Sequence, residues 1–301
     1  EQKDCDSEQA KVREINSGIY WFKAEKLSGL LDKLGNNNAA GEYYLTDTVA
    51  VAEKKGVYTA ESADVVLGAN SRSQLAALNE VARKRKLAEL MDEGVDIPLS
   101  DGIIIGKDVK IGHDTVILPN TIIKGKTVIG NGCEIGPNSY IVDCVIEDNV
   151  ILNNVQAHES KVDSKAKAGP FVHLRPNTHL HSGVKIGDFV EVKNSEIGIN
   201  TCIAHLTYIG DSDVGKGVNF GCGCVTANYD GIKKYRTTIG DNAFIGCNTN
   251  MIAPVTIGDN ATTAAGSTIT KNVPADSLAV ERGQTRIIEH WEKNSKRIKK
   301  A

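Results

Sequence analysis

The chain has 301 residues, enough for one or two domains with a sizeable core. Its 35 basic and 38 acidic residues give a net charge of −3, which provides no electrostatic reason to expect nucleic acid or an anionic membrane as a partner. No apolar run is long enough to cross a bilayer and no signal-peptide core is present, so the sequence predicts a soluble, cytoplasmic protein without membrane insertion.

The numbers of cysteine, glycine and aromatic residues indicate which kind of protein this is. The seven cysteines are scattered and contain no CxxC pair, which favours reduced thiols over disulfides or a structural zinc site. Aromatic residues make up only 5% of the chain, whereas glycines number 29, a balance typical of a narrow solenoid lined with aliphatic side chains. The chain begins at Glu1 without Met, which suggests that an upstream portion exists.

Residues 1–72 are expected to form the end of an α/β domain. We predict a strand at Val12–Trp21, a helix at Ala24–Leu34, and a further apolar-periodic segment at Glu42–Glu53.

A linker helix is predicted next, at Ser73–Asp92 within a linker spanning 73–97. Apolar residues recur at helical spacing among dense charges, at Leu75, Leu78, Val81, Leu87 and Leu90.

From Leu99 onward an aliphatic residue recurs at every sixth position. The first frame runs through eight positions without exception: Leu99, Ile105, Ile111, Ile117, Ile123, Ile129, Ile135 and Ile141. The period returns with small shifts at Leu174–Val192, Ile197–Ile209, Val214–Phe220 and Ile239–Ile269, where Thr263 is a polar exception.

A period of six fits neither a helix nor an alternating strand, but it fits a short strand followed by a turn. Three such faces make a coil of about 18 residues, and stacked coils bury one another's apolar faces. We therefore predict a parallel β-helix of nine or ten coils over 98–280, followed by a Lys-rich tail at 281–301. Glycines that follow the aliphatic residue are expected to supply backbone conformations at the corners. The spacing does not determine handedness, and crossover statistics alone favour a right-handed coil.

Because a bare repeat is compatible with a purely structural role, function must come from what interrupts it. The spacing from Phe220 to Ile239 exceeds three hexapeptides, and the polar stretch between them offers only Ile232 as a core candidate. We expect a loop to leave the prism at Asn228–Arg236, carrying side chains suited to a phosphorylated, hydroxyl-rich ligand.

Individual side chains add chemistry to this region. His205 follows an inward Ile203, and an imidazole is the natural group to take a proton from an amine at neutral pH. Arg175, Lys193 and Lys234 could converge on a phosphate.

A histidine cluster in HLRPNTHLH comprises His173, His179 and His181. His179 and His181 fall on one side of a strand, but a metal site would need a properly placed third ligand. The sequence therefore favours no metal site at these histidines.

Several runs resemble the bifunctional bacterial N-acetylglucosamine-1-phosphate uridylyltransferase/glucosamine-1-phosphate acetyltransferases over almost the whole chain. They are EINSGIY, NNNAAGEYYLTD, GANSR, GPFVHLRP, GDFVEVKNS, AHLTYIGDS, VNFGCG, ANYDG and AVERGQ. The resemblance implies a left-handed parallel β-helix, acetyl-CoA as co-substrate, a homotrimer, and acetylation of glucosamine-1-phosphate for cell-wall precursor synthesis.

The resemblance also implies residue roles. His205 would be the proton acceptor, assisted electrostatically by Glu191. The acceptor would be held by Arg175, Lys193, Tyr208, Asn219 and Lys234. Acetyl-CoA would be bordered by Cys222, Asn228, Tyr229, Cys247, Ala265 and Arg282. Cys222 and Cys247 stand where Ala and Ser are usual in the family. An acyl-cysteine intermediate is a weaker alternative, because the family reaction is direct transfer.

Only remnants of the uridylyltransferase site are expected. Glu1, Asn16 and Asn70 match family positions that touch the sugar nucleotide, and Asn70 also matches a Mg²⁺ ligand. The nucleotide loop and the first metal-binding Asp would lie upstream of Glu1, so uridylyl transfer is expected to be missing from the chain as given. Two rival functions stay open: a sugar-nucleotide pyrophosphorylase that uses the β-helix only for oligomerisation, and a purely structural trimerisation solenoid. A different acceptor, such as serine or another amino-sugar, is a third alternative.

Overall fold

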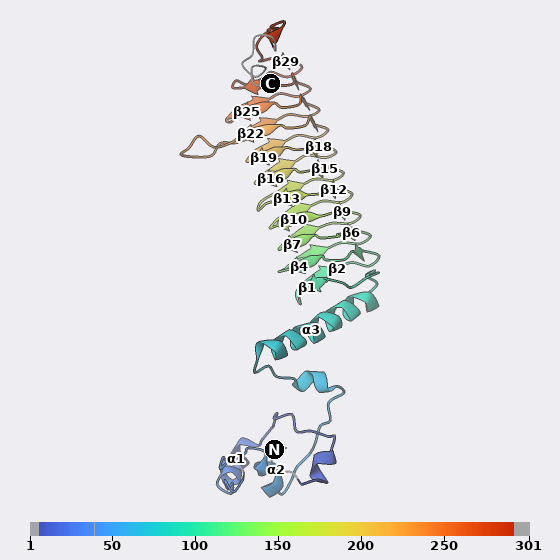
Figure 1. The fold of residues 1–301 in the computed structure, drawn as a ribbon, viewed down its shortest axis with the longest axis vertical. Coiled ribbons are helices and arrows are strands. Elements are labelled where there is room, and N and C mark those ends of the chain that lie inside the picture. Colours follow the sequence, from blue (N-terminus) through green and yellow to red (C-terminus); the bar gives the residue numbers. More distant parts are fainter. Residues whose placement is uncertain (1–5, 39, 292–301) are drawn as a thin grey trace, which may run out of the picture. The chain divides into compact units, whose positions relative to one another are not determined.

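A computed structural model of the chain describes residues 6–38 and 40–291 (Figure 1). The chain divides into two compact units, Glu1–Val81 and Ala82–Ala301.

The first unit contains short helices and, in its described residues, no strand. Its elements are η2 (Gln9–Lys11), α1 (Ala24–Leu31), α2 (Asp47–Val51) and η3 (Ala63–Val66). The predicted strand at Val12–Trp21 is wrong: its apolar side chains are exposed, with Trp21 99% accessible. A strand needs a neighbouring strand to pair its backbone groups, and this part of the chain offers none.

Two other predictions for this unit hold in shortened form. Helix α1 begins at the predicted Ala24 but ends at Leu31, and single hydrogen-bonded turns continue to Leu34. Of the segment Glu42–Glu53, only α2 is helical.

Helix α3 (Arg72–Asp92) confirms the predicted helix. Leu87 and Leu90 are buried in the core of the second unit, whereas Leu75 is exposed.

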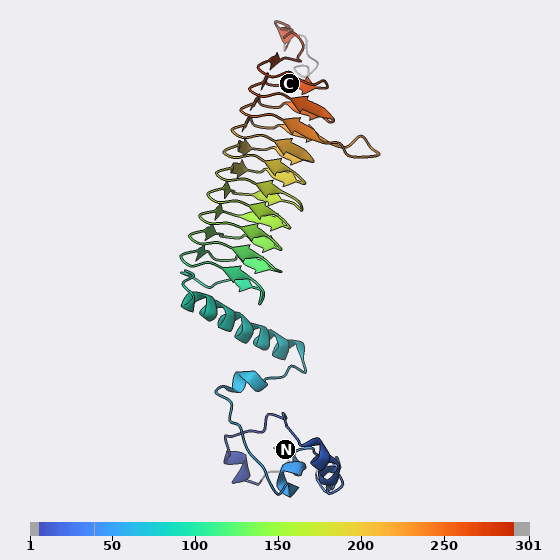
Figure 2. The ribbon, with the colours of Figure 1, turned by 180° about the vertical axis from the view of Figure 1, so that it is seen from behind.

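The second unit is a parallel β-helix with hexapeptide repeats and about ten turns (Figures 1 and 2). Its coils are left-handed, as the family resemblance implies and against the general crossover preference. Three parallel sheets form the faces of the prism, and each strand pairs with the equivalent strand one coil away.

Sheet 1 contains β1 (Ile104–Ile105), β4 (Ile122–Lys124), β7 (Tyr140–Val142), β10 (Val155–His158), β13 (Val172–Leu174), β16 (Glu191–Lys193), β19 (Tyr208–Gly210), β22 (Val225–Ala227), β25 (Asn250–Ile252) and β28 (Thr268–Ile269). Sheet 2 contains β2 (Lys110–Ile111), β5 (Val128–Ile129), β8 (Val145–Ile146), β11 (Lys161–Val162), β14 (His179–Leu180), β17 (Glu196–Ile197), β20 (Ser212–Val214), β23 (Thr237–Ile239) and β26 (Val255–Ile257). Sheet 3 contains β3 (Val116–Ile117), β6 (Glu134–Ile135), β9 (Ile151–Leu152), β12 (Lys167–Ala168), β15 (Lys185–Asp188), β18 (Cys202–His205), β21 (Asn219–Phe220), β24 (Phe244–Ile245), β27 (Thr262–Thr263) and β29 (Leu278–Ala279).

The repeat positions line the core as predicted. Every member of the first frame from Ile105 to Ile141 is at most 8% exposed, and the later frames are equally buried. Leu99 is the error: it precedes the first strand and is 61% exposed. The polar exception Thr263 also points inward, where its hydroxyl accepts a hydrogen bond from the Gly246 amide at 3.1 Å.

Gly136, after Ile135, has the positive φ expected of these glycines, but most of the glycines that follow an inward aliphatic residue are required for close stacking instead. At Gly130 an added Cβ would lie 2.8 Å from backbone atoms of the next coil, so close stacking requires the glycine. The left-handed backbone conformation occurs at the corners, where asparagine is the commonest residue among non-glycines, as at Asn120 and Asn200.

Two further observations concern membrane spans and the state of the cysteines. Among the described residues, no helix has both the length and the apolarity that a bilayer span requires. The six cysteines in this part of the chain are all free thiols.

Candidate functional site

One corner of the prism, where sheet 3 turns into sheet 1, carries a column of predicted site residues. From coil to coil the column runs Asp188, His205, Cys222, Cys247 and Ala265. The amide following each later member donates to the carbonyl of the member before it, with N···O distances of 2.9, 3.3, 2.7 and 2.7 Å. The backbone ladder thus places side chains that are far apart in sequence one strand spacing, about 4.8 Å, from each other.

The column ends at a cation. The Arg282 guanidinium donates from Nη1 to the Ala265 carbonyl at 3.2 Å. Cys247, Ala265 and Arg282 are exposed, and Cys222 is half-buried. The side of the column beyond His205 is therefore an open strip of small side chains that ends at a positive charge.

His205 lies at the sheet 3 side of this corner, with an exposed side chain. The Thr207 hydroxyl donates to the His205 carbonyl at 2.7 Å and so fixes the turn. Tyr208 then begins β19, the strand of sheet 1 that follows the corner. His205 and Tyr208 consequently flank the same corner from two faces.

Glu191, which the resemblance implies assists His205 electrostatically, forms an ion pair with a cation of the site. Its Oε1 accepts from Arg175 Nη1 at 2.7 Å, with the two side chains 38% and 40% exposed. This hydrogen bond raises the pKa of Arg175. Within the described residues, Glu191 hydrogen-bonds Arg175 and not His205. We therefore place Glu191 among the residues that position the cations.

The three cations named from the sequence do converge. Arg175 and Lys193 occupy outward positions on adjacent coils of sheet 1, and Lys234 reaches Lys193 from the loop after β22. Contact with Lys234 lowers the pKa of Lys193, and burial lowers it further. The negative charge of Asp211 acts to raise this pKa, but the net shift is downward. Arg175 adds to the repulsion. Like charges held this close favour the binding of an anion between them.

Asp211 is the counter-charge at the centre of this group, and the sequence did not single it out. It is buried, and Lys193 Nζ lies 4.0 Å from its Oδ2. The side-chain amide of Asn194 donates to Asp211 at 2.5 Å, and that of Asn228 donates to the other carboxylate oxygen. The sequence marks this residue only as an acidic side chain two positions after the inward Ile209, and its burial appears only in the structure.

Acid stability tests the role of Asp211. Burial acts to raise its pKa, but hydrogen bonds from Asn194 and Asn228 and the charges of Lys193 and Lys234 outweigh burial and lower it. A carboxyl with a lowered folded pKa stabilises the protein above its unfolded value of 3.8, and this contribution is lost as pH falls through the folded pKa. We expect Asp211→Asn to be less stable at neutral pH by about 1–3 kcal/mol and to lose less stability below pH 4 than the unmodified chain.

Urea unfolding measured from neutral to acidic pH checks this expectation. Asp108→Asn, at an exposed position of the first coil, is the matched control and should follow the unmodified chain. Equal acid sensitivity of both variants would contradict the role given to Asp211.

Gly210 makes room for two site residues. A Cβ at this position would lie 2.3 Å from Tyr208 Oη and 2.7 Å from Asn228 Nδ2. The Asn228 amide also donates to Tyr208 Oη at 3.4 Å, so the two side chains form one contact above the glycine. These close neighbours are the ends of side chains and not backbone atoms. A methyl group at position 210 would therefore push the Tyr208 and Asn228 side chains aside while leaving the backbone of the coil in place.

For the acetyl transfer that the family resemblance implies, Gly210→Ala is accordingly expected to weaken use of the acceptor by about tenfold to a hundredfold, the scale of a misplaced binding group. Steady-state kinetics with varied acceptor would measure the change. Gly106→Ala is the matched control, because its Cβ would meet neighbours at an ordinary 3.5 Å. Equal kinetics for both variants would show that Tyr208 and Asn228 need no space at Gly210.

The predicted loop leaves the prism between β22 and β23 (Figures 1 and 2). It is a narrow hairpin: Tyr229 and Lys234 pair as an antiparallel bridge, and the Tyr235 amide donates to the Asn228 carbonyl at 2.9 Å. Ile232 is 88% exposed and is not a core residue. Arg236 anchors the end of the loop by donating to Asp213 from Nε at 2.8 Å.

The other predicted residues lie as follows. Asn219 is exposed on β21, next to Cys202 of the preceding coil. Tyr229 is 60% exposed on the hairpin. In the first unit, the side-chain amide of Asn16 donates a hydrogen bond to the Tyr20 hydroxyl. The main-chain amide of Asn70 donates to the side-chain oxygen of Gln74 at 2.7 Å. Glu1 lies outside the described residues.

Comparison with known families agrees with the repeat. Residues 108–143 and 236–271 match the family described as bacterial transferase hexapeptide (six repeats). LpxA from Acinetobacter baumannii, a solved structure, is a remote likeness at a TM-score of 0.35 and 18% identity, covering 62% of this chain and 71% of that one.

Curated relatives are much closer in sequence. The bifunctional protein GlmU of Clostridium acetobutylicum is 48% identical over 294 residues, which cover 97% of this chain and 64% of the relative. The bifunctional protein GlmU of Acetivibrio thermocellus is 50% identical over 295 residues, again 97% of this chain and 64% of the relative. The chain thus spans slightly less than two-thirds of the length of these relatives.

Proposed function

We propose that this GlmU-like chain transfers an acetyl group from acetyl-CoA to the amine of glucosamine-1-phosphate, producing N-acetylglucosamine-1-phosphate for cell-wall precursor synthesis. The observation that carries the proposal is the corner that brings His205 and Tyr208 together, with a strip of small residues on one side and converging cations on the other. An amine acceptor, an elongated thioester and a phosphate each find a matching surface there.

The chemistry assigned to the corner is direct transfer. His205 takes a proton from the acceptor ammonium, the free amine attacks the thioester carbonyl, and the CoA thiolate leaves and is protonated. Because the Asn228 side chain already donates to Asp211 and Tyr208, we give it a positioning role. In the Asn228–Arg236 loop the main-chain amides of Asp230, Ile232, Lys233 and Tyr235 already donate within the hairpin, so the oxyanion is assigned to the other main-chain amides there.

Substrate placement follows the two faces of the corner. The phosphate is assigned to Arg175, Lys193 and Lys234, since guanidinium and ammonium groups are the usual phosphate ligands. Tyr208 and Asn219 are assigned to the sugar. Acetyl-CoA is assigned to the column side, along Cys222, Cys247 and Ala265 to Arg282, with Tyr229 on the hairpin.

A homotrimer is part of the proposal. Phe171 and Phe189, on neighbouring coils of the corner that carries His205, stack at a centroid distance of 5.1 Å although they are 54% and 57% exposed. Leu206 beside His205 is 59% exposed. Exposed apolar side chains in a row favour coverage by a neighbouring subunit. Sedimentation equilibrium of the chain should give three times the monomer mass.

The chain spans 64% of the length of the GlmU relatives, and acetyl transfer is the activity proposed for it. A uridylyl-transfer assay on the 301-residue chain should be negative, and turnover there would favour the pyrophosphorylase alternative.

The decisive experiment measures thiol release from acetyl-CoA with glucosamine-1-phosphate, glucosamine and serine side by side. We expect rapid release with glucosamine-1-phosphate alone. Equal rates with glucosamine would contradict phosphate recognition by the three cations. Absence of release with every acceptor would favour the structural solenoid.

A further inference from the structure

A second group of chemically active side chains lies on sheet 2, the face of the prism opposite the corner that carries His205. His179 on β14 and His181 directly after that strand lie on either side of the inward Leu180. Strand pairing sets His179 beside Glu196 of the next coil, and Asp163 follows β11 of the preceding coil. Three coils therefore contribute two imidazoles and two carboxylates to one spot.

The contacts within the group are close and orderly. Asp163 faces both rings: its Oδ1 lies 2.9 Å from His179 Nε2, and its Oδ2 lies 3.1 Å from His181 Nδ1. Glu196 faces the opposite nitrogens: its Oε2 lies 2.9 Å from His179 Nδ1 and 3.1 Å from His181 Nε2. The ring centroids are only 3.9 Å apart.

This arrangement divides the ring nitrogens into two sets. One nitrogen of each histidine faces Asp163, and the other nitrogen faces a single oxygen of Glu196. Metal-binding histidines characteristically hold the metal with one nitrogen while the other donates to a carboxylate that fixes the tautomer. Glu196 is placed to fix both tautomers at once.

We propose that Asp163 Oδ, His179 Nε2 and His181 Nδ1 bind a divalent transition-metal ion of the zinc class, with Glu196 as the carboxylate that orients both imidazoles. Ligand atoms from these three residues lie within 4.8 Å of one another. With metal–ligand distances of about 2.0–2.2 Å, the edge of a tetrahedron is about 3.3–3.5 Å. His179 Nε2 and His181 Nδ1 lie 2.9 and 3.1 Å from different oxygens of Asp163, so a carboxylate that binds the ion through both oxygens needs these two separations to open by only a few tenths of an ångström.

Lys161 occupies the cation's place when no metal is bound. Its ammonium lies 2.9 Å from Asp163 Oδ1 and 3.8 Å from Glu147. Lys161 is half exposed and can swing toward Glu147, which frees the Asp163 oxygen for the metal.

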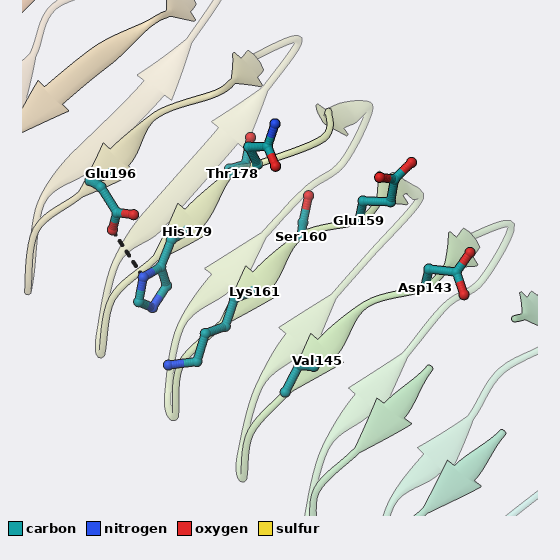
Figure 3. A pocket seen from close by; sticks show the side chains of 9 residues that line it. Asp143, Val145, Glu159, Ser160, Lys161, Thr178, His179 and Glu196 are labelled. Carbon is teal, nitrogen blue, oxygen red and sulfur yellow. Dashed lines mark ion pairs between the residues drawn. The ribbon is translucent and has the colours of Figure 1, made fainter. Parts of the chain in front are cut away.

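The group is accessible to an ion. A shallow hollow of about 490 Å³ adjoins the group on the side of Lys161, His179 and Glu196 (Figure 3), and Asp163 and His181 lie outside its wall. The side chains of Asp163, His179 and His181 are 13%, 19% and 33% exposed. Three protein ligands with a solvent-facing side leave a fourth position for water.

The third ligand required by the sequence argument is therefore a carboxylate from the preceding coil and not a third histidine. His173 lies on sheet 1, where its ring meets His158 at 6.0 Å. It belongs to a different face from His179 and His181, so it provides a matched control.

Metal binding by the untagged full chain, treated first with chelator, tests the proposal with Co²⁺ as a visible-absorbing probe and Zn²⁺ as competitor. We expect one Co²⁺ per chain with the intense absorption of a tetrahedral site, lost on addition of Zn²⁺. His179→Ala, His181→Ala and Asp163→Asn should each weaken binding at least a hundredfold, and Glu196→Gln by about 10–100-fold. His173→Ala should bind as the unmodified chain does.

The metal-free melting temperature of each variant verifies that it folds, as expected for replacements of outward side chains. Failure of the unmodified chain to bind Co²⁺ would overturn the proposal, as would unchanged binding by His181→Ala. Because binding is measured without acetyl transfer, the result is independent of the proposed catalytic function.

Discussion

Replacement of His205 by Ala is expected to lower the turnover number for acetyl transfer at least a hundredfold, within the general-base range of about 10²–10⁴. The physical reason is that an ammonium cannot attack a thioester until it has lost a proton. His205 is the exposed imidazole of the column that runs from Asp188 toward Arg282. Thiol release from acetyl-CoA at saturating acceptor measures the effect.

The structure also predicts what this change leaves intact. The His205 side chain is exposed, and the corner is held by its carbonyl, which accepts from Thr207 at 2.7 Å and from the Gly223 amide at 3.3 Å. Melting temperature and the Michaelis constant for acetyl-CoA should therefore change little. His113→Ala, at an exposed position directly after the second coil strand β2 and its Gly112, is the control for loss of an imidazole away from the site. Near-normal turnover by His205→Ala would remove His205 from the reaction.

Replacement of Lys193 by Ala is expected to reduce kcat/KM for glucosamine-1-phosphate by about 10–100-fold. A hydrogen bond to a charged group contributes about 1.5–3 kcal/mol, and Lys193 stands between Arg175 and Lys234 in the cation group. Without a bound anion, the proximity of Lys234 lowers the pKa of Lys193 and disfavours its charged form. An anionic phosphate would relieve that repulsion.

Comparison of acceptors separates this effect from general damage. Glucosamine lacks the phosphate, so Lys193→Ala should change its slow reaction little. Lys193→Ala combined with Lys234→Ala should be less damaging than the two single losses predict, since each removal relieves its neighbour. Lys110→Ala, at an exposed position of the second strand, is the control. Equal losses with both acceptors would place the phosphate elsewhere.

The β-helix was predictable because its period appears directly in the sequence. Ile105 to Ile141 identify the core positions, since each coil repeats the same inward geometry. The same reasoning failed at Leu99, which precedes the first strand of the coils, and at Val12–Trp21, which has no partner strand among residues 6–38 and 40–291. Periodicity reports local geometry, but burial and pairing also require a neighbour.

The site was predictable in its residues but not in its contacts. Arg175, Lys193 and Lys234 could be named from their types, and the stacking of coils brings them together. Asp211 and Gly210 could not be named, because their importance lies in what surrounds them in space. The ligand role of Asp163 was hidden for the same reason, since it belongs to the coil before the one that carries His179.

The hairpin after β22 has a consequence for how such a fold can diversify. The stretch of chain between the paired residues Ser212 and Thr237 is longer than an ordinary coil, yet the coils on either side keep a continuous parallel register. Extra chain can therefore be extruded at a corner while the ladder closes beneath it. Each coil contacts only its immediate neighbours. A repeat scaffold of this kind can therefore keep its stacked coils unchanged while the length and the side chains of its protruding loops vary.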